Sequence, residues 1–270
     1  RDAQESRGLG DVYKRQVPST VAGGFCLPWG AMDFFKALLD QDPAAPRITV
    51  YTEATGARLD FSAQTLQNWV AKIANMLAEE LDLEPGDTIA VNLPVSWQAA
   101  VICLGALARD IDVQLSTSAN AGSDTAQVVF TSPERFEDYP GRDVVLVTED
   151  PFGRGVVESG GTLPLGAIDF GPTVRFYGDQ YFEPTTPLPE LVLTDAAATN
   201  PDSPAGHAGE AHGGHGGPRV LSTGWHDWAS FRANVLEPLA LGGSAVVVSG
   251  LADDSRLEEI RANEKATELR

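Results

Sequence analysis

Short apolar segments alternate with helical segments along most of this chain, and this alternation most limits the folds open to it. The clearest apolar segments are residues 88–93, 126–131, 143–148 and 244–249. Each is about as long as one strand and has few polar positions, so both of its faces need to be covered. The pattern therefore predicts an α/β fold, with a layered, mainly parallel sheet and flanking helices.

Helical periodicity fills the intervals between these strands. Residues 62–81 place apolar side chains at intervals of three and four on one face, and Ser62 is a typical N-cap residue. Residues 150–189 are rich in Gly and Pro, and their pattern does not distinguish helix, strand and loop. Further helices are expected over 31–40, 96–108, 133–139, 228–241 and 253–265, the last with Asp253 as its N-cap. Further strands are expected over 47–51, 58–61, 111–115, 190–194 and 219–222.

The charge of the chain excludes some partners. Its 270 residues include 19 basic and 38 acidic side chains, for a formal net charge of -19. Such an acidic surface repels phosphate backbones and anionic lipids, so neither nucleic acid nor a membrane is expected as a partner. No apolar run is long enough for a membrane-spanning helix. Cys26 and Cys103 lie far apart, which favours a reducing, cytoplasmic setting over a disulfide framework. Cys103 lies within the apolar run 99–107, which predicts that its side chain is buried.

The domain organisation follows from composition. Residues 1–16 have neither strand nor helix periodicity and read like translated adapter sequence, so we expect a non-native tail. The alternative is a genuine disordered tail, and in both cases we expect it to pack against nothing. Residues 17–270 are expected to form one domain. Within it, residues 199–218 hold almost no bulky apolar side chain, which predicts a flexible loop rich in His and Gly.

Two segments carry a family resemblance. Residues 83–107 read LEPGDTIAVNLPVSWQAAVICLGAL, and residues 236–248 read LEPLALGGSAVVV. With the strand end at 59–62 and the run at 169–182, they resemble the N-terminal half of the adenylate-forming superfamily, the AMP-binding, acyl-CoA synthetase-like proteins. The chain is also similar to short members that lack the catalytic motifs. The resemblance implies the layered α/β subdomains with which those enzymes begin.

The same resemblance implies a phosphate-binding loop of Ser, Thr and Gly that ends in Pro-Lys-Gly, directly after the strand expected at 190–194. Residues 195–200 instead read DAAATN, without glycine or lysine. The family's ribose-binding motifs and its C-terminal domain with the catalytic lysine are not found either. We therefore expect no catalytic residue and no cofactor, with ATP, AMP or CoA only if the chain is an active enzyme. The lysines of the chain are Lys14, Lys36, Lys72 and Lys265.

One ligand-binding feature of the superfamily has a counterpart. Active members often carry an aromatic–histidine pair beside the acyl pocket, just before the helix that leads to the last strand. Trp225 and His226 stand at that place, followed by Trp228. The resemblance makes these residues candidates for a residual acyl pocket. The alternative is a helix N-terminus with two packed tryptophans and an exposed histidine.

A second candidate site lies in the glycine-rich loop, where His207, His212 and His215 surround Glu210. Imidazoles and a carboxylate can bind zinc, nickel or copper. The loop offers few groups to orient such ligands, so the expected outcome is weak, adventitious metal binding.

Three functions remain open at this point. The preferred one is a catalytically incompetent adenylate-forming-like domain that acts in binding, regulation or scaffolding on an unknown small molecule or protein. The second is a diverged or truncated acyl-CoA synthetase, and the third is a metal-handling protein that uses the histidine loop. A sheet shorter than that of its relatives leaves an edge to be covered, so a homodimer is also expected.

Overall fold

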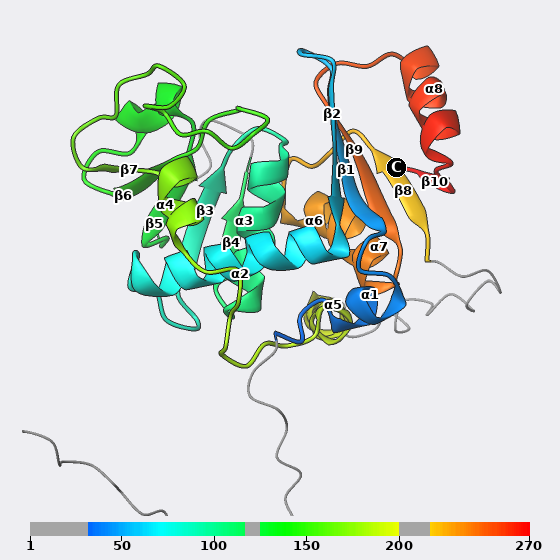
Figure 1. Cartoon of the computed structure of the whole chain (residues 1–270), viewed down its shortest axis with the longest axis horizontal. Coiled ribbons are helices and arrows are strands. Elements are labelled where there is room, and N and C mark those ends of the chain that lie inside the picture. The colour runs from blue at the N-terminus through cyan, green and yellow to red at the C-terminus, as the bar shows by residue number, and fades with distance from the viewer. Residues whose placement is uncertain (1–31, 117–124, 200–216) are drawn as a thin grey trace, which may run out of the picture.

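The computed structural model describes residues 32–116, 125–199 and 217–270, and the expected tail at 1–16 lies outside them. The described strands form two five-stranded sheets rather than one, here named sheet A and sheet B (Figure 1). Both sheets are mainly parallel and both carry flanking helices, so the predicted α/β class is confirmed. Among the described strands, the first two in the sequence belong to sheet A, the next five form sheet B, and the last three belong to sheet A.

Sheet B comes from one stretch of the chain. It runs in the order β4-β3-β5-β6-β7, and every neighbouring pair is parallel. Because β4 and β5 lie on opposite sides of β3, the strand order reverses between β3 and β5. Because all five strands are parallel, their carboxyl ends lie at the same edge of the sheet. Open parallel sheets usually bind ligands at this edge, beside the point where the strand order reverses. The strands are β3 (Thr88–Asn92), β4 (Asp112–Leu115), β5 (Val128–Thr131), β6 (Asp143–Leu146) and β7 (Ala167–Asp169).

Sheet A joins the two ends of the described chain. The hairpin of β1 (Pro46–Thr52) and β2 (Ala57–Ser62) is antiparallel, and its turn uses the positive φ of Gly56, +67°. The order is β10-β8-β9-β1-β2, with parallel pairs apart from the hairpin. Ile48 of β1 therefore pairs with Ala245, close to the other end of the chain. The later strands are β8 (Arg219–Ser222), β9 (Ser244–Ser249) and β10 (Glu268–Leu269).

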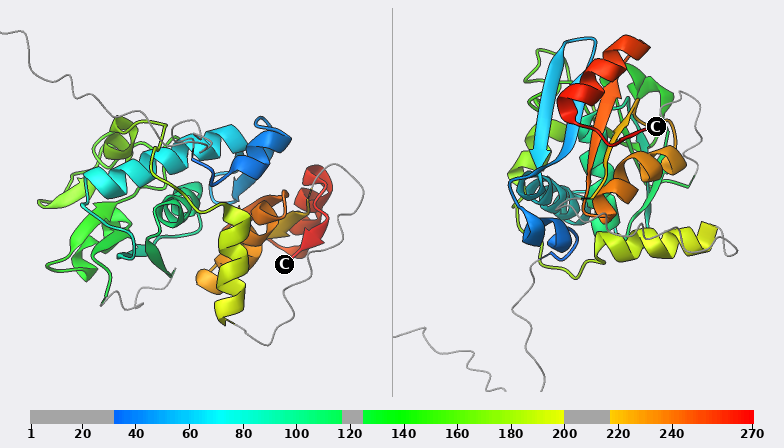
Figure 2. Two further views of the ribbon diagram at one scale, coloured as in Figure 1. Left: turned by 90° about the horizontal axis from the view of Figure 1, so that it is seen from below. Right: turned by 90° about the vertical axis from the view of Figure 1, so that its right-hand side faces the viewer.

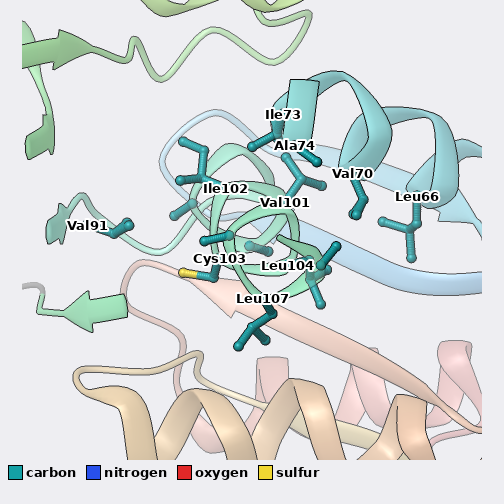
Figure 3. Close-up of a cluster of buried hydrophobic side chains, with 14 of the residues drawn as sticks. Leu66, Val70, Ile73, Ala74, Val91, Val101, Ile102, Cys103, Leu104 and Leu107 are labelled. Atoms are coloured by element: carbon teal, nitrogen blue, oxygen red, sulfur yellow. The ribbon is translucent and has the colours of Figure 1, made fainter. Parts of the chain in front are cut away.

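Two helices fill the main core, α2 (Ala63–Glu79) and α3 (Trp97–Ala108). Each begins at a serine N-cap, as Ser62 Oγ accepts a hydrogen bond from Thr65 N and Ser96 Oγ accepts one from Ala99 N. All of α3 is buried, whereas α2 buries one face. Figure 3 shows side chains of the two helices gathered together, among them Leu66, Val70, Ile73, Ala74, Val101, Ile102, Cys103, Leu104 and Leu107.

Cys103 behaves as the sequence predicts. Its side chain is fully buried among the apolar residues of α3, and this burial raises the pKa of the thiol. The group is therefore a neutral, inert part of the core at neutral pH.

Helices cover both faces of sheet A (Figure 2). Val246 and Val248 of β9 pack with Ile260 of α8 (Asp254–Glu264). Ala245 and Val247, which alternate with them, belong to the main core with the helical segment on the other face. That segment consists of α6 (Trp228–Phe231), a π-helical stretch η2 (Arg232–Leu236) and α7 (Glu237–Ala240).

The strand expected over 190–194 is wrong, because these residues belong to helix α5 (Leu188–Thr199). Leu188 and Val192 are buried four residues apart, and Glu190 between them is exposed, which is a helical and not a strand periodicity. Pro189 fits the first turn of a helix, where its missing amide has no partner to lose. A short apolar run such as LVL does not by itself distinguish the two structures.

Smaller differences concern lengths and helix types. Residues 133–138 form a 3₁₀ helix, η1 (Pro133–Asp138), and α1 (Lys36–Gln41) is shorter than expected. Residues 150–189, to which the sequence pattern assigned no element, contain β7 and α4 (Phe170–Phe176). Among the residues that the structure describes, no helix has the length and hydropathy needed to span a bilayer.

Candidate functional site

Trp225, His226 and Trp228 lie where β8 passes into α6. Asp227 between them is the N-cap of α6, because its Oδ1 accepts a hydrogen bond from Ser230 N at 2.8 Å. Ser230 Oγ accepts one from Asp227 N at 3.1 Å, which completes a capping box. The hydrogen bond from the Ser230 hydroxyl lowers the pKa of the Asp227 carboxyl. The sequence Trp-His-Asp-Trp therefore starts a helix.

The two tryptophans pack against the same ring. The ring centroid of Phe231 lies 5.0 Å from that of Trp225, edge to face, and 5.6 Å from that of Trp228. Trp225 is buried, and its indole N–H has no acceptor within hydrogen-bond distance among the described residues. A buried donor of this kind is unusual and could meet an oxygen atom of a bound molecule.

His226 is separated from this aromatic group. Its side chain is 79% exposed, and its Nε2 lies 3.3 Å from Asp227 Oδ2. The structure thus brings the tryptophans together with Phe231 and leaves the imidazole at the surface. The arrangement is that of a capped helix start, and ligand binding at these residues stays a prediction.

This turn lies where the two sheets meet. Ser116, directly after β4, forms an isolated bridge with Asp227. Gly224 has a φ of +93°, and a Cβ on it would lie 2.7 Å from the side chain of Val95, after β3. Only glycine allows this approach at this backbone conformation. The β8–α6 turn therefore contacts the carboxyl edge of sheet B.

The expected position of a phosphate-binding loop needs correction, because residue 195 lies within helix α5 and does not follow a strand. The segment before α5 is instead tied to α2. Lys72 Nζ donates a hydrogen bond to the Tyr177 carbonyl at 2.7 Å, and Asn75 Nδ2 donates to the carbonyls of Gly178 and Gln180. Lys72 therefore anchors a loop.

Arginines near the carboxyl edge of sheet B are bound to the protein itself. Arg135 donates a hydrogen bond to Asn92 Oδ1 at 2.8 Å and pairs with Asp138 at 3.3 Å. Arg154 pairs with Asp150 at 2.7 Å. These cations already have partners that a nucleotide phosphate would have to displace.

A polar cluster that the sequence did not predict lies at this edge. Asn92 ends β3 and is buried, and its Nδ2 donates to the Tyr139 hydroxyl. Thr131 ends the neighbouring β5, and its hydroxyl donates to the Asn92 carbonyl at 3.3 Å. The available signal was a polar residue at the end of each apolar strand, TIAVN and VVFT.

The metal candidates His207, His212 and His215 lie outside the described residues. Within the described ranges, no three His, Cys, Asp or Glu side chains are grouped so that they could hold a metal ion. Metal binding by the histidines stays a prediction.

The paired sheets and their helices define the class of protein. The structure matches the crystal structure of an acyl-CoA synthetase from Brucella canis with a TM-score of 0.65 at 16% identity. The match covers 88% of this chain and 47% of the synthetase, so the chain spans about half the length of that enzyme. The predicted adenylate-forming-like fold is therefore confirmed.

A curated relative narrows the class to a family. The "TIGR03089 family protein" of Mycobacterium tuberculosis (strain ATCC 25618 / H37Rv) is 31% identical over 269 residues, which make up 94% of this chain and 99% of the relative. The chain belongs to this TIGR03089 family. The relative is of similar length, so the expected similarity to a short protein is also confirmed. A scan against protein-family models found no match.

Proposed function

We propose that this chain is a catalytically inactive relative of the adenylate-forming enzymes and acts as a binding, regulatory or scaffolding protein. The proposal rests on the observation that positively charged side chains which could bind phosphate already bind other groups of the protein. Activation of an acid by ATP requires positive charge and backbone amides around the phosphates. The sequence has no lysine between Lys72 and Lys265, and Lys72 holds the Tyr177 carbonyl.

Arginine would be the remaining source of positive charge. Near the carboxyl edge of sheet B, Arg135 and Arg154 are paired with Asp138 and Asp150. Recruiting either one for a phosphate would leave a carboxylate of the protein beside the phosphate, and the two negative charges repel each other. The geometry therefore supports a protein that retains the fold without ATP chemistry.

The direct test is isothermal titration calorimetry of the full chain with ATP and with AMP in the presence of Mg²⁺. We expect no saturable heat. Circular dichroism of the same sample shows that the protein is folded. Binding with a micromolar dissociation constant would overturn the proposal. A Lys72→Met variant would then show whether Lys72 has become the phosphate ligand, because binding should fall in that variant.

Pyrophosphate exchange distinguishes this proposal from a diverged synthetase. The chain is incubated with labelled pyrophosphate, ATP and a panel of carboxylic acids. An inactive protein incorporates no label into ATP with any acid, whereas acid-dependent incorporation would establish an enzyme.

A further inference from the structure

The outward face of α2 has few charges for a helix of this chain. Residues 63–78 hold one charged side chain, Lys72, whereas α8 holds six in its eleven residues. Figure 1 shows α2 lying across the front of the described chain. Gln64 is exposed there, and Asn68 and Trp69 are partly exposed. The helix therefore presents a polar but almost uncharged surface on a chain with a net charge of -19.

Residues 176–182, named here the strap, follow the start of α4's last turn and are bound to this face. Lys72 Nζ donates a hydrogen bond to the Tyr177 carbonyl at 2.7 Å. Asn75 Nδ2 donates to two further carbonyls of the strap, at 3.1 and 2.9 Å. The strap holds one charged side chain, Asp179, which is opposite in sign to Lys72. The helix face and the strap together therefore have no net charge.

Exposed aromatic side chains surround this neutral surface. Phe176 and Phe182, at the two ends of the strap, are 86% and 67% exposed. Beside the N-terminal half of α2, Phe152 is 76% exposed, and a Cβ on the neighbouring Gly153 would lie 3.9 Å from the Trp69 ring. The centre of a protein–protein interface is enriched in aromatic residues and depleted of charge, as this surface is.

The polar groups of this surface already have partners. Gln64 Nε2 donates to Asn68 Oδ1 at 2.9 Å, and Lys72 and Asn75 bind carbonyls of the strap. A polar group that keeps its hydrogen bond costs less free energy to remove from water than an unpaired one. Covering this surface is therefore less costly than covering a face with unpaired polar groups.

The charge of the chain indicates what covers the surface. Two copies with a net charge of -19 repel each other, and the repulsion is smallest where neither copy presents a net charge. A basic partner would instead be attracted to the acidic remainder of the chain. The same neutral surface on two copies can meet across a twofold axis, as an isologous dimer requires.

We propose that this surface joins two copies of the chain in a twofold dimer, in which Phe176 and Phe182 of each copy pack on α2 of the other. The two α2 helices then run antiparallel across the axis. The proposal goes beyond the loss of ATP chemistry and does not depend on it. It also differs from the pairing of sheet edges, because it covers a helix face and leaves the strand edges free.

Sedimentation equilibrium of the full chain at about 0.15 M and about 1 M NaCl tests the dimer. We expect a dimer whose dissociation constant falls at the higher salt concentration, because the repulsion between the acidic copies is screened. Phe176→Glu/Phe182→Glu should raise the dissociation constant by roughly tenfold or more, since it places two carboxylates of each copy in the interface. Both side chains are exposed, and circular dichroism checks that the variant is folded.

A matched variant controls for the added charge. Leu251→Glu/Leu269→Glu adds the same charge at two other exposed positions, after β9 and in the edge strand β10, and should leave the dissociation constant unchanged. In the unaltered chain the indole N–H resonance of Trp69 should shift between dilute and concentrated samples. This shift should vanish in Phe176→Glu/Phe182→Glu.

Three results would overturn the proposal. The first is a monomer at every protein concentration at about 1 M NaCl. The second is a dimer that Phe176→Glu/Phe182→Glu leaves intact. The third is weakening by Leu251→Glu/Leu269→Glu that equals or exceeds the effect of the phenylalanine variant, which would indicate general charge repulsion or pairing at the β10 edge.

Discussion

At the scale of single residues, Glu264 joins the last long helix to sheet A. Its side chain is 7% exposed and accepts hydrogen bonds from the Tyr51 hydroxyl at 2.6 Å and from Arg58 Nε at 2.7 Å. It also pairs with Arg219 of β8. Burial opposes its ionisation, but the hydrogen bonds from these three partners outweigh burial and lower its pKa to about 2.

This network predicts the effect of Glu264→Gln. The neutral amide leaves Arg58 and Arg219 without their carboxylate, so we expect a loss of about 2 kcal/mol in the free energy of unfolding at pH 7. The pKa of Glu264 is lower in the folded state than its ordinary value of 4.5. Its stabilisation is therefore complete above pH 4.5 and is lost as the pH falls toward 2. Urea denaturation at several pH values measures both effects.

A control on the same helix separates this network from surface charge. Glu258 pairs with Arg261 at 3.4 Å in solvent, and Glu258→Gln should change the stability by less than about 0.5 kcal/mol. The difference between wild type and Glu264→Gln should shrink below pH 4.5. A difference that stays constant down to pH 2 would show that Glu264 does not stabilise through its charge.

At the scale of elements, the contact between α2 and α3 depends on Gly105. A Cβ at this position would lie 2.4 Å from Cγ2 of Ile73, closer than real atoms approach. In a solvent-exposed helix, alanine in place of glycine would raise the free energy of unfolding by about 1 kcal/mol. In this contact the helices would have to move apart, and such overpacking costs about 1–3 kcal/mol.

We therefore expect Gly105→Ala to lower the free energy of unfolding by about 1 kcal/mol, the reverse of the helix-propensity effect. Thermal and urea denaturation would measure it. Gly178→Ala is the control, because its added Cβ meets nothing nearer than 4.0 Å at Gln180 O and should not destabilise. Gly105→Ala with unchanged or increased stability would contradict this account of the helix contact.

Elements differ in how far the sequence predicts them. The caps Ser62 and Asp253 were predicted correctly, since a cap depends on its own hydrogen bond to an amide three residues later. Residues 190–194 were predicted wrongly, because an apolar run forms a helix or a strand according to what it packs against. Local sequence was enough to predict the two serine-capped helices, α2 and α3. Predicting α5 required knowing which residues it packs against.

At the scale of the whole molecule, the expectation of a homodimer concerns the edges of the two sheets. Within the described chain, sheet A ends at β10 and β2, and sheet B ends at β4 and β7. The homodimer expected from an uncovered edge stays a prediction. The net charge of -19 opposes it by repulsion, so association should strengthen with salt. Light scattering across protein and salt concentrations tests this, and a monomer at high concentration in high salt would refute it.

The sequence by itself determined the α/β class, most strand and helix positions, the burial of Cys103 and the absence of a lysine between Lys72 and Lys265. These properties depend on local periodicity, side-chain chemistry and residue identity. Only the tertiary structure decided that the strands divide between two sheets and that the strap is bound to α2. Strand pairing and the contacts of the strap join residues distant in the chain, and a hydrophobic pattern shows that a strand is buried without showing which strand lies beside it.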